Sequence, residues 1–422
     1  MLVMKLKLVP NNREIRAPTV TPHFYSMKKL SFTLALVLLL PVLSPGWGFF
    51  AHKTIAQLAV YSLPGSMQGF YYRHMGELVK KITAPDERRE SDPAEAPKHF
   101  IDMDHYGSDP FGAMPKEWDK AVAKYSADTL RKYGTVPWVV TEVKEKLTEA
   151  FRQRDTVAII TLSADLGHYV SDAFVPLHTT ENYDGQLSNQ AGLHSLWESK
   201  LPERHIADYK LRSKPGSYLK DPQAAIWQVV QRSYGFLGAT FDMEEEVSRK
   251  YTPETKYTYS HKYGKTRRAY SDAFADAYHE KVGGMVMNRL QLAPTMVASM
   301  WLTAWKDAGS PDLDLLMKKP SKEEKEKLAS ELKLWKDNQL VPQNQLLAMQ
   351  KEKTVERPDE IKSAVDMAPA PTEPEPAVAV PAPAAQPAPV AAPAKAKVKA
   401  KSDDGIKQKT KVKAAKTDDG WN

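Results

Sequence analysis

Two pairs of residues that can bind a metal ion lie close together in the middle of the chain. His168 and Asp172 are four residues apart in a helical pattern, and His194 and Glu198 repeat this spacing. Residues four apart share one face of a helix, so each pair can bind a single cation. His178 lies between the two pairs. We therefore predict that all five side chains bind metal.

The surroundings of the first pair strengthen this prediction. The segment 155–172 is mostly apolar but carries Asp165 beside His168 and Asp172, and no Lys or Arg occurs between Asp155 and Lys200. Burial of an unpaired carboxylate is costly, which favours a bound cation as the source of the compensating charge. The chain has no cysteine, so the ligands must be nitrogen and oxygen atoms. The alternative is that the histidines pair with carboxylates without any metal.

Two further segments contain residues of the same type. The stretch "APKHFIDMDHY" contains His99 and Asp102, and "ITAPDERRES" contains Asp86 and Arg89. Taken alone, each segment is typical of an ordinary polar loop.

Helical periodicity predicts the elements that position these residues. Apolar residues recur at spacings of three and four, and no stretch alternates Val, Ile and Thr as a sheet strand does. We predict one all-α domain over residues 47–342, without repeats or a glycine-rich phosphate loop. The expected helices are 49–64, 138–151, 155–174, 221–237 and 279–305, of which 155–174 is a buried central helix that begins at the N-cap Asp155.

The N-terminal region is predicted to be a secretion signal. Met27 and two lysines precede the apolar run "LSFTLALVLLLPVL", and "SPG" provides small residues before Trp47. Residues 1–46 are therefore interpreted as an upstream extension and a cleaved signal that starts at Met27, and we expect a secreted or periplasmic protein. The alternative is an uncleaved membrane anchor.

The C-terminal region, residues 343–422, is rich in Pro, Ala and Lys and is expected to be disordered. It is interpreted as a solvated spacer or as a tail that binds anionic surfaces. The net charge of +7 comes from the two ends, because residues 1–46 contribute +5 and residues 343–422 contribute +2. The middle of the chain has no net charge, which argues against a basic clamp for nucleic acid.

The order of these residues resembles the zinc phospholipase C and single-strand nuclease superfamily, an all-α family. The matching pattern is Trp-x4-His, Asp, His-Phe-x-Asp, His-x3-Asp-x5-His and His-x3-Glu, from Trp47 to about Glu203. In that family the mature protein begins with tryptophan, whose amino group and carbonyl oxygen bind zinc. Cleavage between Gly46 and Trp47 would create this ligand.

The resemblance implies three zinc ions. Asp172 is expected to bridge the first two. The expected ligands are Asp86, His99, His168 and Asp172 for the first ion, Trp47, His52 and Asp172 for the second, and His178, His194 and Glu198 for the third.

The resemblance also implies a reaction. A water between two zinc ions has a lowered pKa and can attack a phosphodiester, while the third zinc stabilises the leaving oxygen. Asp86 is expected to orient or deprotonate that water, and Arg89 to hold a phosphate oxygen. Phe100 and Asp102 resemble a pair that stacks on a base and forms hydrogen bonds with it. A nuclease would act on single-stranded DNA or RNA and leave 5′-phosphate ends.

The sequence leaves three functions open. The short spacing from Trp47 to His52, together with Arg89, favours a nuclease. Glu198 and the short spacing from His178 to His194 match the phospholipase C branch, for which "GFYYRHM" and "KYTYSHKYGKTRRAY" would provide aromatic surface for phospholipid. The third alternative is a zinc-binding protein without catalysis. We expect a monomer, and no protein partner can be identified from the sequence.

Overall fold

The computed structural model describes residues 48–262 and 265–350. The predicted secretion signal, Trp47 and residues 351–422 lie outside the described residues. Tertiary contacts divide the chain into Met1–Lys353 and Thr354–Asn422, and every described residue belongs to the first unit. Within that unit helices dominate, and the expected all-α fold is confirmed.

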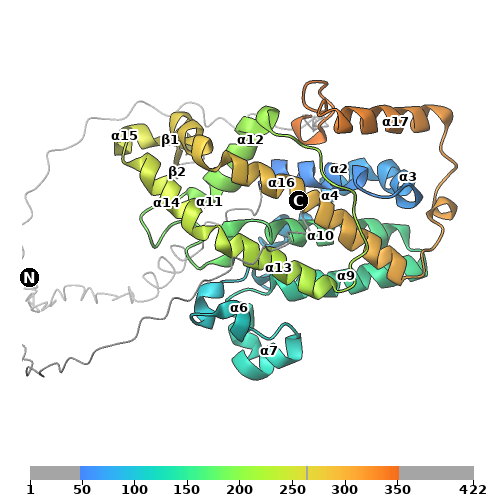
Figure 1. Cartoon of the computed structure of the whole chain (residues 1–422), viewed down its shortest axis with the longest axis horizontal. Helices are drawn as coiled ribbons and strands as arrows, with labels where there is room; N and C mark the ends of the chain where they lie inside the picture. Colours follow the sequence, from blue (N-terminus) through green and yellow to red (C-terminus); the bar gives the residue numbers. More distant parts are fainter. Residues whose placement is uncertain (1–47, 263–264, 351–422) are drawn as a thin grey trace, which may run out of the picture. The chain divides into compact units, whose positions relative to one another are not determined.

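Helix α10 (Thr156–Asp172) lies at the centre of this unit (Figure 1). It packs against α9 (Val136–Gln153), α16 (Asp272–Asp307), α2 (Phe49–Tyr61) and α4 (Met75–Lys81). The Asp155 side chain accepts a hydrogen bond of 3.0 Å from the Ala158 amide, as an N-cap does. The predictions of a buried central helix and of its N-cap are both confirmed.

Other predicted helices agree in place but differ in length. The 221–237 prediction corresponds to α13 (Pro222–Gly235), which Asp221 caps. The 279–305 prediction underestimates α16, which starts at Asp272 and continues through Pro294. Proline is unfavourable inside a helix, and the packing of α16 against α2, α9, α10 and α14 (Leu237–Ser248) compensates for this cost.

The remaining helical elements are short. They are α3 (Gly65–Arg73), α5 (Ala84–Arg88), α6 (Pro110–Ala113), α7 (Trp118–Tyr125), α8 (Ala127–Lys132), α11 (Leu193–Ser195), α12 (Leu201–His205), α14 (Leu237–Ser248), α15 (Pro253–Lys256), α17 (Lys322–Lys336), and the tighter or wider turns η1 (Ala96–Lys98), η2 (Met103–Tyr106), η3 (Pro176–Thr179), η4 (Leu196–Lys200), η5 (Ile206–Asp208), η6 (Leu313–Leu316) and η7 (Leu347–Met349). None of the helices in the described part of the chain combines the length and the apolar character needed to span a bilayer.

One antiparallel hairpin interrupts the helices. Strands β1 (Tyr257–Lys262) and β2 (Lys265–Tyr270) pair with each other, and Tyr257 is opposite Tyr270. The expectation of no sheet was wrong for this segment. Its alternation uses Tyr with Thr and Ser instead of aliphatic residues, so the usual strand pattern does not reveal it. By contrast, Phe70 and Tyr71 of the "GFYYRHM" segment are buried in α3 and are core residues.

The folded unit continues beyond residue 342, the predicted end of the domain. Leu346 is completely buried. The Gln57 side chain of α2 donates a hydrogen bond to the Gln345 carbonyl and accepts one from the Leu347 amide, each 2.8 Å long. Residues 343–350 therefore pack on the helices and do not belong to the predicted tail.

A buried arginine of α16 holds the C-terminal end of α10. Arg289 is 1% exposed, and its Nε donates a 2.9 Å hydrogen bond to the Phe174 carbonyl. Its Nη2 donates a hydrogen bond to the Ser233 hydroxyl, which in turn donates one to the Ala173 carbonyl. Burial lowers the pKa of Arg289 to about 9. Arg289 and Ser233 thus supply donors to the Phe174 and Ala173 carbonyls, which the end of α10 leaves without intrahelical partners.

We expect Arg289→Met to lower the free energy of unfolding by roughly 2–4 kcal/mol, because the Phe174 carbonyl then loses its donor. Denaturant unfolding followed by circular dichroism measures the change. The matched control is Arg232→Met on the exposed face of α13, which we expect to change stability by less than about 0.5 kcal/mol. An Arg289→Met protein as stable as the unchanged protein would contradict this role.

Candidate metal centre

Four elements direct five predicted ligands toward the C-terminal end of α10. His168 and Asp172 come from α10 itself, and His52 comes from α2. Asp86 lies on α5, and His99 follows η1. All five side chains are buried, Asp86 being the most exposed at 7%. Segments far apart in the sequence therefore converge on one interior site.

The predicted ligands of the first ion lie close together. Asp172 Oδ2 lies 2.9 Å from His99 Nδ1 and 3.2 Å from His168 Nε2. Asp86 Oδ1 lies 3.7 Å from His99 Nδ1 and 3.8 Å from His168 Nε2. The donor atoms of His99, His168 and Asp172 all lie within 4.8 Å of one another, which suits ligands of one cation, and Asp86 forms a second such group with His52 and His168.

The two carboxylate oxygens of Asp172 face different groups. Oδ1 lies 3.4 Å from His52 Nε2, whereas Oδ2 faces His99 and His168. His52 also lies within 4.8 Å of donor atoms of Asp86 and His168. The His52 ring stacks on His168 with centroids 4.0 Å apart. This geometry agrees with a bridging carboxylate. Trp47 lies outside the described residues, so its predicted role as a ligand stays a prediction.

The chain enters α2 against the segment that carries Glu198. The Gly48 amide donates a 3.3 Å hydrogen bond to the Glu198 carbonyl. A Cβ atom at position 48 would lie 2.3 Å from Ser199 Oγ, so only glycine permits this close approach. The first described residue after Trp47 is thus fixed beside the third predicted group.

That third group is compact. His178 Nε2 lies 3.0 Å from His194 Nε2, and Glu198 Oε2 lies 2.8 Å from His194 Nε2 and 3.4 Å from His178 Nε2. Glu198 lies on η4, a π-helical turn that follows α11 directly. The sequence predicted an ordinary helix here. Such wide turns are often found at functional sites, because they redirect one side chain.

Backbone carbonyls fix the orientation of two histidine rings. His168 Nδ1 donates to the Ile82 carbonyl at 2.8 Å, and His178 Nδ1 donates to the His99 carbonyl at 2.7 Å. Each bond holds the proton on Nδ1 and leaves the lone pair of Nε2 directed into the site. This is how metal-binding histidines are oriented in proteins.

Several buried polar atoms of the site have no hydrogen-bond partner among the described residues. They include both ring nitrogens of His52, Asp172 Oδ1 and Glu198 Oε1. Burial lowers the pKa of His52 to about 4, with a contribution from His168, and burial raises the pKa of Glu198 to about 8. A neutral imidazole is the form that binds metal, and a cation removes the penalty for the buried carboxylate. The residues present therefore fit divalent metal ions.

Sequence reasoning missed a second layer of residues around His99. Glu95 is 1% exposed, and its Oε1 lies 3.7 Å from His99 Nε2. Tyr169 and Lys98 both donate hydrogen bonds to this carboxylate. Burial alone would raise the pKa of Glu95, but hydrogen bonds from His99, Lys98 and Tyr169 hold it below its usual range. The spacing of four between Glu95 and His99 was the available signal.

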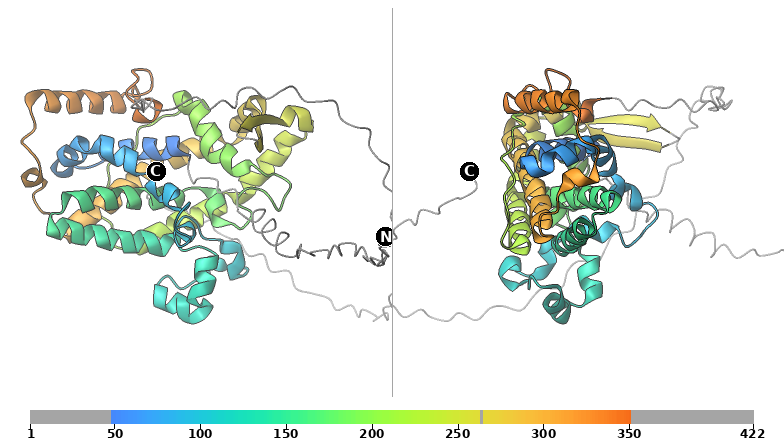
Figure 2. Two further views of the ribbon diagram at one scale, coloured as in Figure 1. Left: turned by 180° about the vertical axis from the view of Figure 1, so that it is seen from behind. Right: turned by 90° about the vertical axis from the view of Figure 1, so that its right-hand side faces the viewer.

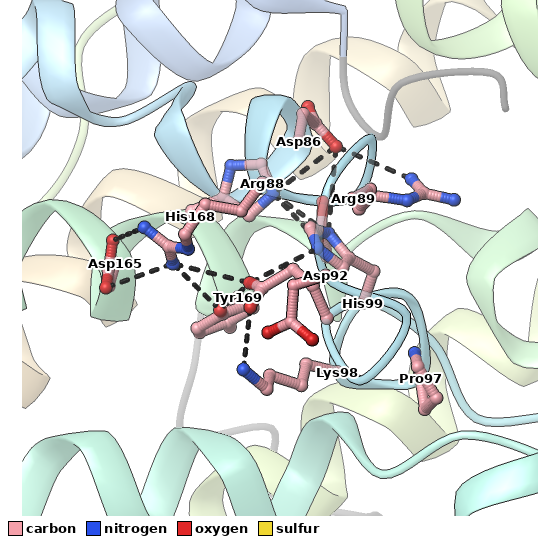
Figure 3. A network of polar contacts seen from close by, with 12 residues as sticks. Asp86, Arg88, Arg89, Asp92, Pro97, Lys98, His99, Asp165, His168 and Tyr169 are labelled. Atoms are coloured by element: carbon pink, nitrogen blue, oxygen red, sulfur yellow. Dashed lines mark hydrogen bonds and ion pairs between the residues drawn. The ribbon is translucent and has the colours of Figure 1, made fainter.

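Arg88 completes this second layer and corrects the charge argument made from the sequence. Figure 3 shows its guanidinium between Asp165 and Tyr169. Its Nη2 lies 3.1 Å from Asp165 Oδ2 and 3.3 Å from Glu95 Oε1. Asp165 therefore obtains its compensating charge from Arg88 and needs no metal. Of the two carboxylates on α10, the argument for a cation therefore applies only to Asp172.

Of the predicted substrate residues, Arg89 contacts a predicted ligand, and Phe100 and Asp102 follow His99 in the chain. Arg89 Nη1 lies 3.5 Å from Asp86 Oδ1 (Figure 3). Phe100 is partly buried. Its carbonyl oxygen packs closely against Gly134, which has φ +91°. A Cβ atom added at position 134 would lie only 2.2 Å from this oxygen. Burial raises the pKa of Asp102 to about 8, with contributions from Asp104 and Glu181. A protonated Asp102 at neutral pH can donate a hydrogen bond as well as accept one.

Comparison with known proteins identifies the family of this chain. The chain is 23% identical over 202 residues to nuclease S1 of Aspergillus oryzae. The matched stretch covers 44% of this chain and 64% of the fungal protein, less than two thirds of its length. Residues 47–305, which contain every predicted ligand, match the S1/P1 nuclease family. This chain belongs to the S1/P1 nuclease family.

Proposed function

We propose that this chain is a secreted, zinc-dependent phosphodiesterase that cleaves single-stranded DNA or RNA and leaves 5′-phosphate ends. The observation that supports it most is the pair of donor groups on the two oxygens of Asp172, with a third group at Glu198. Membership in a nuclease family and the similarity to a fungal nuclease support the same reaction.

The donor set suits zinc ions, which we propose are three in number. Nitrogen and carboxylate oxygen are both accepted by zinc. The ligands would be those predicted from the resemblance, including the amino terminus of Trp47 after cleavage of the signal. Bound zinc lowers the pKa of a coordinated water and stabilises charge on phosphate oxygens.

The chain's own residues would bind and orient the substrate. Asp86 faces both His99 and His168, where it can accept a proton from the attacking water. Arg89 lies next to Asp86 and can bind a phosphate oxygen through two N–H groups. Phe100 and Asp102 would contact a base, and Asp102 would donate a hydrogen bond in its protonated form. No protein nucleophile is required for this reaction.

A phospholipase C activity is the second candidate. Glu198 and the short spacing between His178 and His194 favour it. The burial of Phe70 and Tyr71 removes one of the two segments that were expected to contact lipid. The match to a nuclease family is a separate argument, and it favours nucleic acid as the substrate.

Metal content is the first test. We expect mature protein purified without chelator to contain about three zinc ions per chain, one for each group of buried ligands. Inductively coupled plasma mass spectrometry measures the content. Dialysis against a chelator should remove phosphodiesterase activity, and added zinc should restore it. Active protein with one zinc or none would refute the assignment.

Asp172→Asn tests the bridging carboxylate. We expect the variant to lose two zinc ions and more than about a hundredfold in activity. The reason is that changing a residue that only hydrogen-bonds to a metal ligand already costs about ten- to hundredfold in metal affinity or activity. The matched control is Asp165→Asn, on the same helix but paired with Arg88, which should keep its zinc. Equal metal content in the two variants would exclude the bridge.

The substrate is tested by parallel assays with single-stranded DNA, RNA and phosphatidylcholine vesicles. We expect turnover of both nucleic acids, with 5′-phosphate ends identified by mass spectrometry of the products. Turnover of the phospholipid alone would replace the nuclease proposal with a phospholipase C. Zinc-loaded protein that hydrolyses none of the three would indicate a binding protein.

A further inference from the structure

The β1–β2 hairpin is attached to the loop that leads into the third ligand group. The Tyr270 hydroxyl donates to the Gln190 carbonyl at 3.0 Å, and Arg268 Nη2 donates to the Ala191 carbonyl at 3.3 Å. Two residues later the same loop enters α11, which carries His194. The hairpin base is therefore held beside the metal centre.

A buried carboxylate makes this attachment rigid. Glu244 of α14 is 1% exposed, and its Oε1 lies 2.8 Å from the Tyr270 hydroxyl, whose single proton it shares with the Gln190 carbonyl. Glu244 also accepts a hydrogen bond of 2.5 Å from the Gln190 side chain and lies 2.8 Å from Lys256 Nζ. Hairpin and loop thus share one buried acceptor, which fixes their mutual position.

From this base the strands extend away from the helices, as the right-hand view of Figure 2 shows. Their sequences, "YTYSHK" and "KTRRAY", contain four Lys or Arg and no acidic residue. Residues 47–342 together have no net charge, whereas the hairpin strands carry a local excess of positive charge. Such a concentration attracts a polyanion and is screened by salt.

One face of the hairpin combines rings with a guanidinium group. Arg268 lies over the Tyr257 ring, with Cζ 4.3 Å from its centroid. In the strand register Tyr259 is opposite Arg268, so the two side chains lie on the same face. Tyr259 is 62% exposed, and Arg268 is exposed without an ion pair to any residue in the described ranges. Aromatic rings combined with cations are the surface on which single strands stack their bases.

We propose that the hairpin face formed by Tyr257, Tyr259 and Arg268 is a docking surface for single-stranded nucleic acid, which it holds beside the metal centre during cleavage. This inference rests on the proposed nuclease function. The strands contain no Leu, Ile, Val, Met or Phe that would insert into a lipid surface. Charge and exposed ring together therefore favour a nucleic acid as the occupant.

The experiment compares a polymer with a small phosphodiester on zinc-loaded protein. Tyr259→Ser and Arg268→Gln are assayed on long single-stranded DNA and on bis(p-nitrophenyl) phosphate. We expect each change to raise KM for the polymer, by about tenfold for the stacking ring, with kcat unchanged. Tyr259→Phe should restore the KM. The small substrate does not reach the hairpin, so its kinetic constants should not change.

Two controls separate charge and ring from general effects. Lys322→Gln removes a cation that is 84% exposed on α17, and Tyr218→Ser removes a ring that is 45% exposed before α13. Neither should alter KM for the polymer. Arg268→Gln should also reduce the slope of log KM against log salt by about 0.7, the value for one phosphate contact on a single strand.

The outcomes are distinguishable. Unchanged KM for the polymer in both hairpin variants would overturn the docking surface and leave the nuclease function intact. Hydrolysis of neither substrate by the unchanged protein would overturn the proposed function itself. If the two variants instead lose binding to phosphatidylglycerol vesicles while KM for the polymer stays constant, the hairpin contacts membranes and the inference is wrong.

Discussion

The buried carboxylate of Asp172 is the interaction on which the rest of the site depends. It is completely inaccessible to solvent at the end of α10, with one oxygen facing His99 and His168 and the other facing His52. A charge in such a position is tolerated only with matched positive charge close by. The surrounding side chains supply imidazole nitrogens, which suit metal ions. Burial by itself would lower the pKa of His168, but the carboxylates of Asp172 and Asp86 raise it to about 9.

The fold holds this carboxylate in place through the backbone. Arg289 and Ser233 bind the carbonyls just beyond Asp172, so the helix end cannot move without leaving buried polar groups unsatisfied. The histidines depend on the backbone in the same way, since His178 donates to the carbonyl of His99. The backbone of one predicted ligand thus orients the side chain of another. Hydrogen bonds within the folded chain therefore help to position the ligands.

Charged residues around the ligands divide into two sets. On one side Arg88, Lys98 and Tyr169 converge on Glu95 and fix the ring of His99. On the other side Glu244 joins the β1–β2 hairpin to the loop before His194. Both sets centre on a buried glutamate with several donors. A buried carboxylate stabilises a structure when hydrogen-bond donors satisfy its oxygen atoms.

The sequence by itself determined the helical class, the central helix and the two pairs at spacing four, because these follow from local periodicity. Residues such as Asp86 and His99 looked like ordinary loop residues and gained meaning only from a family resemblance. The sequence could not reveal that Arg88 neutralises Asp165 or that a Tyr-rich segment forms a hairpin. Only the tertiary structure decided these points, since each depends on contacts or pairing that no local pattern encodes. Helix periodicity is a property of neighbouring residues, whereas charge compensation depends on which distant segments meet in a region that excludes water.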